Sequence, residues 1–361
     1  MSKRSEKQIA EQEQAAAARR GKRKTVIIAA ALVLGVCLTA GALARWNSSA
    51  AFMPAPFQPT PTPMPVTLSK EYVYAGGGGR LLSVIDKGAE APVPTDLAVW
   101  RRSSSGQATW YVLANGTTTV AGNWGSNSDL PAPGDYDGDG KVDFSVYRPG
   151  TTGAFYILAT STNSLQSATF GGASDIPAVS DYDGDGRSDI GLYRGSNSTF
   201  YIIRTSDNQL ATLAVGSSGD VPAVSDYDGD GLADPCVFRG SAGNFYWLKS
   251  GENYSSATQS WGSTNDVPAP GDYDGDGKSD FTIFRSGTWH MLQSTAGYVA
   301  TSWGVATDTL VPGDYDADGK TDIGVWRNST GVWYLLKSTA GSYSVTFGSP
   351  GDIPVPAPYR R

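Results

Sequence analysis

Beyond residue 70 the chain is a series of short hydrophobic segments separated by turn residues. Between residues 176 and 216 the segments IPAVS, IGLYR, FYIIR and TLAVG follow one another, with Gly, Ser, Asn and Asp between them. Short runs rich in β-branched and aromatic residues with such boundaries are typical of strands. No segment after residue 70 shows the 3.6-residue period of a helix. The pattern predicts an all-β domain over residues 71–361.

The four segments form a unit that recurs along the chain. Five units carry an acidic stretch between their first and second segments. The first Asp of that stretch lies at positions 135, 181, 226, 272 and 314, in steps of 46, 45, 46 and 42 residues. This period is typical of propeller repeats, in which one unit is a four-stranded blade. A further unit, from about Ala91 to Gly125, precedes these five and keeps only Asp96 of the acidic stretch.

Both ends of the repeat region resemble incomplete units. EYVYAGGGGRLLSVID, residues 71–86, is similar to the later half of a unit, and GDIPVPAPYRR, residues 351–361, to the opening half. Joining the two halves into one blade would close the ring and remove its open sheet edges. We therefore expect an all-β fold that is a seven-bladed β-propeller. A six-bladed β-propeller with a frayed N-terminal strand pair is the alternative.

The first 70 residues have a different composition. Residues 25–44, TVIIAAALVLGVCLTAGALA, are twenty uncharged positions, about the length that a helix needs to cross a membrane. Residues 1–24 carry eight Lys/Arg, and the positive-inside rule keeps such a flank in the cytoplasm. We expect a basic cytoplasmic tail (1–24), one N-terminal transmembrane helix in the plasma (inner) membrane (25–44), a Pro/Thr-rich linker (45–70) and an extracytoplasmic propeller. The alternative is secretion after signal-peptide cleavage near Ala44.

The charge of the main domain limits its partners. The chain has 28 Lys/Arg and 35 Asp/Glu, of which nine and three precede residue 46, so residues 46–361 keep 19 and 32 and carry −13. Such an acidic domain argues against binding to a phosphate backbone, and we expect no nucleic-acid partner. The only cysteines, Cys37 and Cys236, are too few for a disulfide framework.

The acidic stretches have the chemistry of calcium loops. They place carboxylates at loop positions 1, 3, 5 and 9 with glycines between them, and alternate side chains of a tight turn converge on one point. Hard oxygen ligands select Ca²⁺ over transition metals. An EF-hand needs Glu at position 12, where the first loop has Val146, so these are calcium loops in β-hairpins. The predicted ligands of about five Ca²⁺ ions are Asp135, Asp137, Asp139, Asp143, Asp181, Asp183, Asp185, Asp189, Asp226, Asp228, Asp230, Asp234, Asp272, Asp274, Asp276, Asp280, Asp314, Asp316, Asp318 and Asp322.

These loops and the strands after them resemble the repeats of the FG-GAP/VCBS family, the propeller type also found at the head of integrin α chains. The resemblance covers about residues 71–361 and rests on PGDYDGDGKVDFSVYR, VSDYDGDGRSDIGLYR, VSDYDGDGLADPCVFR, PGDYDGDGKSDFTIFR and PGDYDADGKTDIGVWR. It implies a seven-bladed ring with mainly structural calcium loops on one face. The sequence departs from the family pattern at Ala317, which replaces Gly in the fifth loop, and in the first unit, which has no loop.

Aromatic and Arg positions that recur in every unit provide candidate ligand-binding residues. Most such repetition reflects packing within blades. The sharper hypothesis is carbohydrate recognition, in which sugar rings stack on aromatic side chains and hydroxyl groups bind Arg. Repeated weak sites would then gain avidity on a glycan surface. The candidates are Trp124, Arg148, Arg194, Arg239, Trp261, Arg285, Trp303 and Arg327.

The sequence shows no catalytic constellation. His290 is the only histidine and occupies a position that is Tyr in other units, and nucleophile-elbow and C-x-x-C motifs are absent. We therefore expect no enzymatic activity. The leading hypothesis is a membrane-anchored, extracytoplasmic, calcium-binding module for a glycan or a cell-surface protein. The alternatives are an extracytoplasmic polysaccharide-degrading enzyme, lyase or glycosidase, and a structural envelope component.

Overall fold

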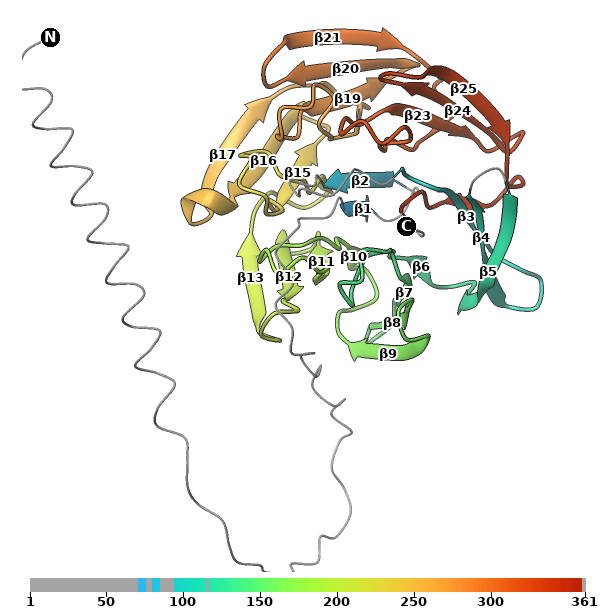
Figure 1. Ribbon diagram of the computed structural model, residues 1–361. Helices are drawn as coiled ribbons and strands as arrows, with labels where there is room; N and C mark the ends of the chain where they lie inside the picture. The colour runs from blue at the N-terminus through green and yellow to red at the C-terminus, as the bar shows by residue number, and fades with distance from the viewer. Residues whose placement is uncertain (1–70, 76–79, 85–93, 115–116, 359–361) are drawn as a thin grey trace, which may run out of the picture. The chain divides into compact units, whose positions relative to one another are not determined.

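A computed structural model of the chain describes residues 71–75, 80–84, 94–114 and 117–358 (Figure 1). Within these residues six antiparallel sheets of four strands form a six-bladed β-propeller. The one helical segment of this part is the short 3-10 helix η1 (Ser250–Glu252). The predicted all-β class is therefore confirmed.

The blades are numbered here in chain order, and their strands are given from the first to the fourth. Blade 1 contains β26 (Ile353–Pro354), β3 (Leu97–Arg101), β4 (Gln107–Ala114) and β5 (Thr117–Ser126). Blades 2 and 3 contain β6 (Leu130–Pro131), β7 (Phe144–Arg148), β8 (Ala154–Ala159), β9 (Ser164–Thr169), β10 (Ile176–Pro177), β11 (Ile190–Arg194), β12 (Thr199–Ile203) and β13 (Leu210–Ala214). Blades 4 and 5 contain β14 (Val221–Pro222), β15 (Cys236–Arg239), β16 (Asn244–Lys249), β17 (Ser255–Ser260), β18 (Val267–Pro268), β19 (Phe281–Arg285), β20 (Thr288–Gln293) and β21 (Gly297–Ser302). Blade 6 contains β22 (Thr309–Leu310), β23 (Ile323–Arg327), β24 (Val332–Lys337) and β25 (Gly341–Thr346).

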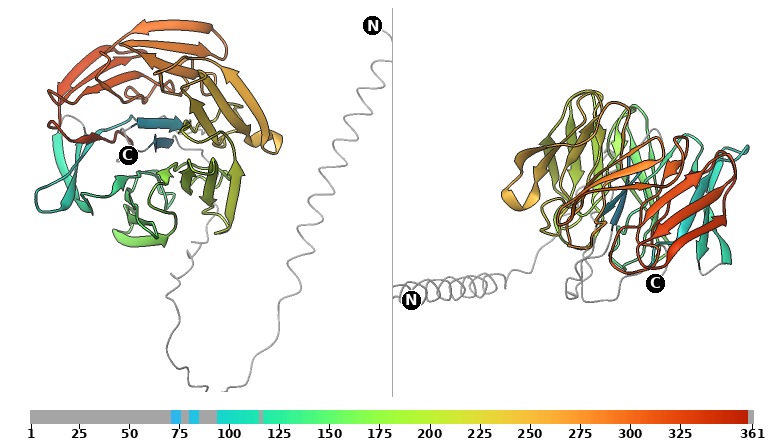
Figure 2. Two further views of the ribbon diagram at one scale, coloured as in Figure 1. Left: turned by 180° about the vertical axis from the view of Figure 1, so that it is seen from behind. Right: turned by 90° about the horizontal axis from the view of Figure 1, so that it is seen from above.

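The position of a strand within its blade explains its hydrophobic pattern. Second strands such as β11 are covered on both faces by neighbouring blades, and all but the last residue of β11 are buried. Third strands alternate: in β12, Phe200 and Ile202 are buried and the residues between them are partly exposed. Fourth strands lie at the outer edge of the blades, as Figures 1 and 2 show, and β13 exposes Leu210. Burial therefore decreases from the second strand outward.

The C-terminal segment closes the ring. Strand β26 pairs with β3, with Ile353 opposite Trp100 and Pro354 opposite Val99, and so supplies the first strand of blade 1. The remaining N-terminal strands, β1 (Glu71–Ala75) and β2 (Arg80–Val84), pair only with each other in a separate two-stranded sheet. The expectation of a seventh blade built from both chain ends is therefore wrong, and the six-bladed alternative is confirmed. The reason is that β26 serves as the first strand of blade 1 and is therefore not paired with β1 or β2.

The hydrophobic core lies between adjacent blades. One cluster joins Tyr193 and Phe200 of blade 3 to Val224 and Val237 of blade 4, and corresponding clusters occur at other blade interfaces. Trp100, Trp289 and four similar aromatic side chains are fully buried in these layers: Trp110, Trp326, Trp333 and Phe155. Because each blade is packed on both sides, rims and loops carry the accessible polar groups.

Several predictions for the N-terminal region fall outside the described residues. These are the cytoplasmic tail (1–24), the membrane span (25–44) and the linker (45–70). In the part of the chain that the structure describes, no helix has the length and apolar character of a membrane span. Cys236 lies in β15, where its thiol is buried and unpaired with another cysteine.

Candidate metal centres

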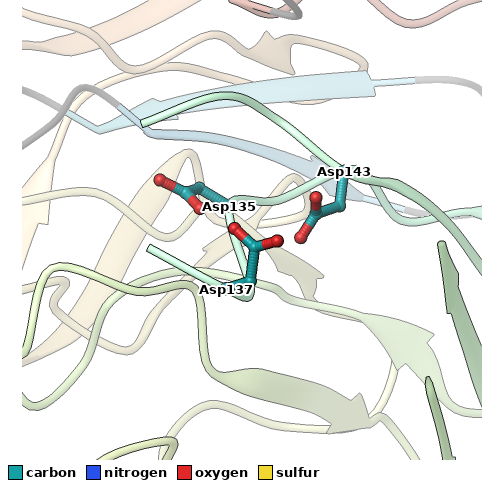
Figure 3. Close-up of side chains that lie close together, drawn as sticks. All are labelled: Asp135, Asp137 and Asp143. Atoms are coloured by element: carbon teal, nitrogen blue, oxygen red, sulfur yellow. The ribbon is translucent and has the colours of Figure 1, made fainter. Parts of the chain in front are cut away.

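The acidic loops bring carboxylates together in five blades. Each loop connects the first strand of blades 2–6 to the second, and in each loop three carboxylate oxygens lie within 4.8 Å of one another. Figure 3 shows the cluster in blade 2. The five groups are Asp135, Asp137 and Asp143; Asp181, Asp183 and Asp189; Asp226, Asp228 and Asp230; Asp272, Asp274 and Asp276; and Asp314, Asp316 and Asp322.

The structure therefore groups three of the four predicted ligands in every loop. The remaining members of the predicted sets lie outside these groups: Asp139, Asp185, Asp234, Asp280 and Asp318. They still belong to the loops through hydrogen bonds, such as that from Thr160 Oγ1 to Asp139 Oδ2 at 3.4 Å. Clustered carboxylate oxygens without nitrogen or sulfur donors fit a hard cation such as Ca²⁺.

The first Asp of each loop organises the turn. Asp135 Oδ1 accepts a hydrogen bond from Gly138 N–H at 2.7 Å, and Oδ2 accepts one from Gly140 N–H at 2.8 Å. The two glycines have φ angles of 78° and 80°, which residues with a Cβ rarely adopt. The corresponding carboxylates of blades 3 to 5 accept the same pair of bonds. The glycines therefore allow the loop to wrap around its first carboxylate.

The last Asp of each loop ties the cluster to a second hairpin. Asp143 Oδ2 accepts the N–H of Tyr136 at 3.0 Å, and Oδ1 accepts Thr160 N–H at 2.7 Å and Thr160 Oγ1 at 2.9 Å. Ser161 Oγ donates to Asp137 Oδ2 at 2.6 Å. Equivalent residues follow the third strand of each loop-bearing blade: Thr160 and Ser161, Thr205 and Ser206, Ser250 and Gly251, Ser294 and Thr295, and Ser338 and Thr339.

Sequence reasoning missed these hydroxyl donors, although a signal was present. A Ser or Thr ends the third segment in every unit that has an acidic loop. The unit without a loop has Asn115 and Gly116 there instead, outside the described residues. The Ser or Thr hydroxyl donors and the acidic loops therefore occur in the same units, as expected if they form one site.

A backbone hydrogen bond links each loop to the next blade. The residue before the last Asp donates its N–H to the carbonyl of the first Asp in the preceding blade, as from Ser188 to Asp135 at 2.7 Å. In blade 1 these roles pass to the chain ends: Thr95 N–H donates to Asp314 O, and Pro358 O accepts from Val142 N–H. The chain therefore enters and leaves the ring where a sixth loop would lie, and only Asp96 remains of that loop.

The packing of each loop against the next also explains why the fifth loop has Ala317 where the other loops have Gly. In blades 2 to 5 a Cβ on the first loop glycine would meet a long side chain of the next loop, such as Arg187 Nε at 3.1 Å from Gly138. After Ala317 the next blade is blade 1, where Pro94 precedes Thr95 and the acidic loop is missing. Ala317 itself has a φ of 59°, in the left-handed region that favours glycine. Space therefore permits a methyl group there, but at a conformational cost.

We expect Ala317→Gly to stabilise the domain by about 0.5–1 kcal/mol, because glycine adopts a positive φ without steric strain. Urea unfolding with Ca²⁺ present measures this change. As a matched variant in blade 2, Gly138→Ala should destabilise by more than that amount, since its methyl group would also contact Arg187. The explanation would be contradicted if Gly138→Ala lost only as much stability as Ala317→Gly gained, or if Ala317→Gly lost stability.

Burial raises the pKa of several carboxyl groups in the clusters. Burial, together with the charge of Asp143, raises the pKa of Asp135 to about 8. Burial and the neighbouring Asp183 raise the pKa of Asp189 to about 8, and burial raises the pKa of Asp143 to about 7. A divalent cation would compensate these charges and displace the protons.

These raised pKa values predict that the stability of the metal-free protein falls with rising pH, while the stabilisation by Ca²⁺ increases. In the metal-free protein the folded state holds more protons than the unfolded state between the usual carboxyl pKa and about 7–8, so its free energy of unfolding should fall as pH rises from 5.5 to 8. Ca²⁺ competes with these protons, so stabilisation by 5 mM Ca²⁺ should grow over the same range. Thermal melts at both pH values with Ca²⁺ and with chelator test this. A chelated protein more stable at pH 8 than at 5.5 would contradict it.

The predicted ligand-binding Arg residues form a second repeated structure. Each pairs through two nitrogens with a buried Asp that opens its blade, as Arg194 does with Asp175 at 2.7 Å and 2.6 Å. The other predicted Arg residues make the same pair: Arg148 with Asp129, Arg239 with Asp220, Arg285 with Asp266 and Arg327 with Asp308. Blade 1 completes the set with Arg101 and Asp352, 2.7 Å apart.

The predicted Trp residues bridge neighbouring blades. Trp124, Trp261 and Trp303 are partly exposed, and each indole N–H donates to a third-strand carbonyl of the next blade. Of the eight predicted ligand-binding residues, Trp261 and Arg285 line one pocket together. Ligand binding by all eight residues stays a prediction.

Comparisons with known proteins identify the fold. The chain matches no protein-family model and no curated protein sequence. A streptogramin B lyase is 8% identical over 78% of this chain and 88% of its own, with a TM-score of 0.45. An Agrocybe aegerita lectin, described for specific recognition of non-reducing terminal N-acetylglucosamine, is 12% identical over 77% and 81%, with a TM-score of 0.50. BBS1N from its complex with ARL6DN is 11% identical over 77% and 88%, with a TM-score of 0.44. At 12% identity the similarity to the lectin shows the fold alone.

Proposed function

We propose that the protein is a calcium-stabilised binding module of the FG-GAP/VCBS type, held outside the cell by a membrane span at residues 25–44, with a glycan as its ligand. The observation that carries the proposal is the cluster of three carboxylates at the same place in five of six blades. Hydrogen bonds tie each cluster to its own blade. The cluster also lies beside the backbone hydrogen bond that joins its loop to the next blade. Metal at these positions would fix the blades relative to one another.

Calcium in this role is scaffold rather than reactive centre. The proposal assigns the carboxylates of each cluster to the ion and the hydroxyl groups behind them to holding those carboxylates in place. Binding is then left to the surface between the blades, where aromatic and Arg side chains recur. Glycan recognition by the Agrocybe aegerita lectin is a property of that protein, and for this chain the proposal rests on its own residues.

The test is binding of the full-length protein, in detergent, to a glycan array with 5 mM Ca²⁺ and again with EDTA, with circular dichroism of both samples. We expect saturable binding in Ca²⁺ and its loss in EDTA together with a loss of stability. A folded, Ca²⁺-loaded protein that binds none of the glycans would overturn the glycan ligand in favour of a protein partner. Product released from a polysaccharide would favour an enzyme.

A further inference from the structure

A pocket of about 560 Å³ opens between blades 4 and 5. Blade 4 contributes Asn244 and Ser260 with Trp261 after them, and blade 5 contributes the side chains of Arg285, His290 and Tyr298. The volume lies within the range of small-molecule sites. Two of these residues distinguish blade 5 from the other blades.

His290 changes what covers the repeated Arg. In the five other blades a third-strand Tyr stacks on the Arg of the Asp–Arg pair, with centroid distances of 4.2–4.7 Å. In blade 5 the equivalent residue is His290, whose ring lies parallel to that of Tyr298 and whose Nδ1 is 2.9 Å from Tyr298 Oη. Arg285 keeps its bonds to Asp266, and 46% of its side chain is exposed, the largest value of the six pairs. In place of a stacked Tyr, the Arg285 side chain lines the pocket.

Tyr298 is a second change in the same blade. The corresponding outer-strand positions of the other blades, read from the strand register, hold Thr118, Leu165, Leu210, Ser256 and Ser342. Tyr298 meets Trp261 edge to face at 5.3 Å, and the Trp261 indole is fixed by its bond to His290 O at 3.1 Å. Two substitutions in one blade that contact each other thus build an aromatic wall across the blade interface.

We propose, on the basis of the proposed glycan-binding function, that this pocket holds one pyranose residue of the glycan and is the single such site of the propeller. The Trp261 and Tyr298 rings offer apolar surface for the C–H face of a sugar, while Arg285, His290 and Asn244 offer hydrogen-bonding groups for its hydroxyls. The five other Arg faces are stacked under Tyr and lack this arrangement.

The experiment titrates the full-length, Ca²⁺-loaded protein with methyl glycosides of glucose, galactose, mannose and N-acetylglucosamine by calorimetry and ligand-observed NMR. We expect one site per chain for at least one glycoside. His290→Tyr restores the residue of the five other blades and should fold normally. Its ring would cover Arg285, so affinity should fall at least tenfold. The matched variant Tyr201→His in blade 3 should leave affinity unchanged.

The outcomes separate this inference from the proposed function. Glycan binding that His290→Tyr leaves unchanged, or several equivalent sites per chain, would overturn the single-pocket proposal while the glycan-binding function stands. A folded protein that binds neither the glycosides nor the array would overturn both. Tyr298→Ser, with the residue of blades 4 and 6, provides a second variant and should also weaken binding at least tenfold.

Discussion

Removal of Ca²⁺ with EDTA should lower the melting temperature of the protein by about 15 °C. Extracellular calcium sites bind at about 10⁻⁴ M, so 5 mM Ca²⁺ would contribute about 2 kcal/mol at each site and about 10 kcal/mol over five sites, which a domain of this size converts to about 15 °C. Differential scanning calorimetry with Ca²⁺ and with EDTA measures the shift. Calorimetric titration should give about five Ca²⁺ per chain.

Variants assign the effect to the clusters. Asp226→Ala should remove one of the five Ca²⁺ ions and part of the shift, because Asp226 is buried and anchors the blade 4 cluster. Asp207→Ala is the matched control: this Asp is exposed, pairs with Arg204 and belongs to no cluster, so the number of ions should stay the same. Equal melting temperatures with and without EDTA would refute calcium as part of the scaffold.

The sequence predicted the metal clusters because all their carboxylates lie in one short loop. A nine-residue segment with two glycines determines its own geometry, and Asp135, Asp137 and Asp143 come together as expected. The hydroxyl donors Thr160 and Ser161 lie 17 and 24 residues from their partners in sequence, so only the pairing of strands brings them close. Contacts within a loop were therefore more predictable than contacts between hairpins.

The blade count was wrong although the sequence contained a signal for it. The Arg that ends the second strand of each of blades 2 to 6 pairs with an Asp 19 residues earlier. Position 82, which lies 19 residues before Arg101, is Leu82, so the partner of Arg101 had to come from elsewhere. Asp352 lies just before Ile353 and Pro354, the same place that the paired Asp has in the other blades. The pairing rule would therefore have placed residues 351–361 in blade 1 and left no seventh blade.

The pocket between blades 4 and 5 could not be read from the repeat pattern. His290 is a visible exception among the units, but its consequence depends on Tyr298, which pairs with Leu292 in the register and reaches the His290 ring only once β20 and β21 are paired. Both side chains line the pocket together with Arg285, and their contact joins two strands. Such an effect follows from side-chain packing across strands, which a period in the sequence does not describe.

Deletion of residues 351–361 should destabilise the domain by about 5 kcal/mol or more. It removes the pairing of β26 with β3, the Arg101–Asp352 ion pair and the buried side chain of Val355. The ion pair accounts for about 2 kcal/mol of the loss, since Arg101 is partly exposed, and burial and strand pairing account for the rest. This is a large part of the 5–15 kcal/mol typical of folded domains, so unfolding in urea, followed by Trp fluorescence, should shift strongly.

The same deletion should also change how the protein associates, because it opens blade 1. Without β26, strand β3 presents unpaired N–H and C=O groups at an edge, which favours pairing with a second chain. Size-exclusion chromatography should detect species larger than those of the intact protein. Deletion of residues 359–361 alone leaves β26 and Pro358 in place and is the control. Asp352→Asn should lose only the ion-pair part, about 2 kcal/mol, and should elute as the intact protein does. A truncated chain that melts within a few degrees of the intact protein would show that β26 is dispensable and that the ring is closed by the blade interfaces alone.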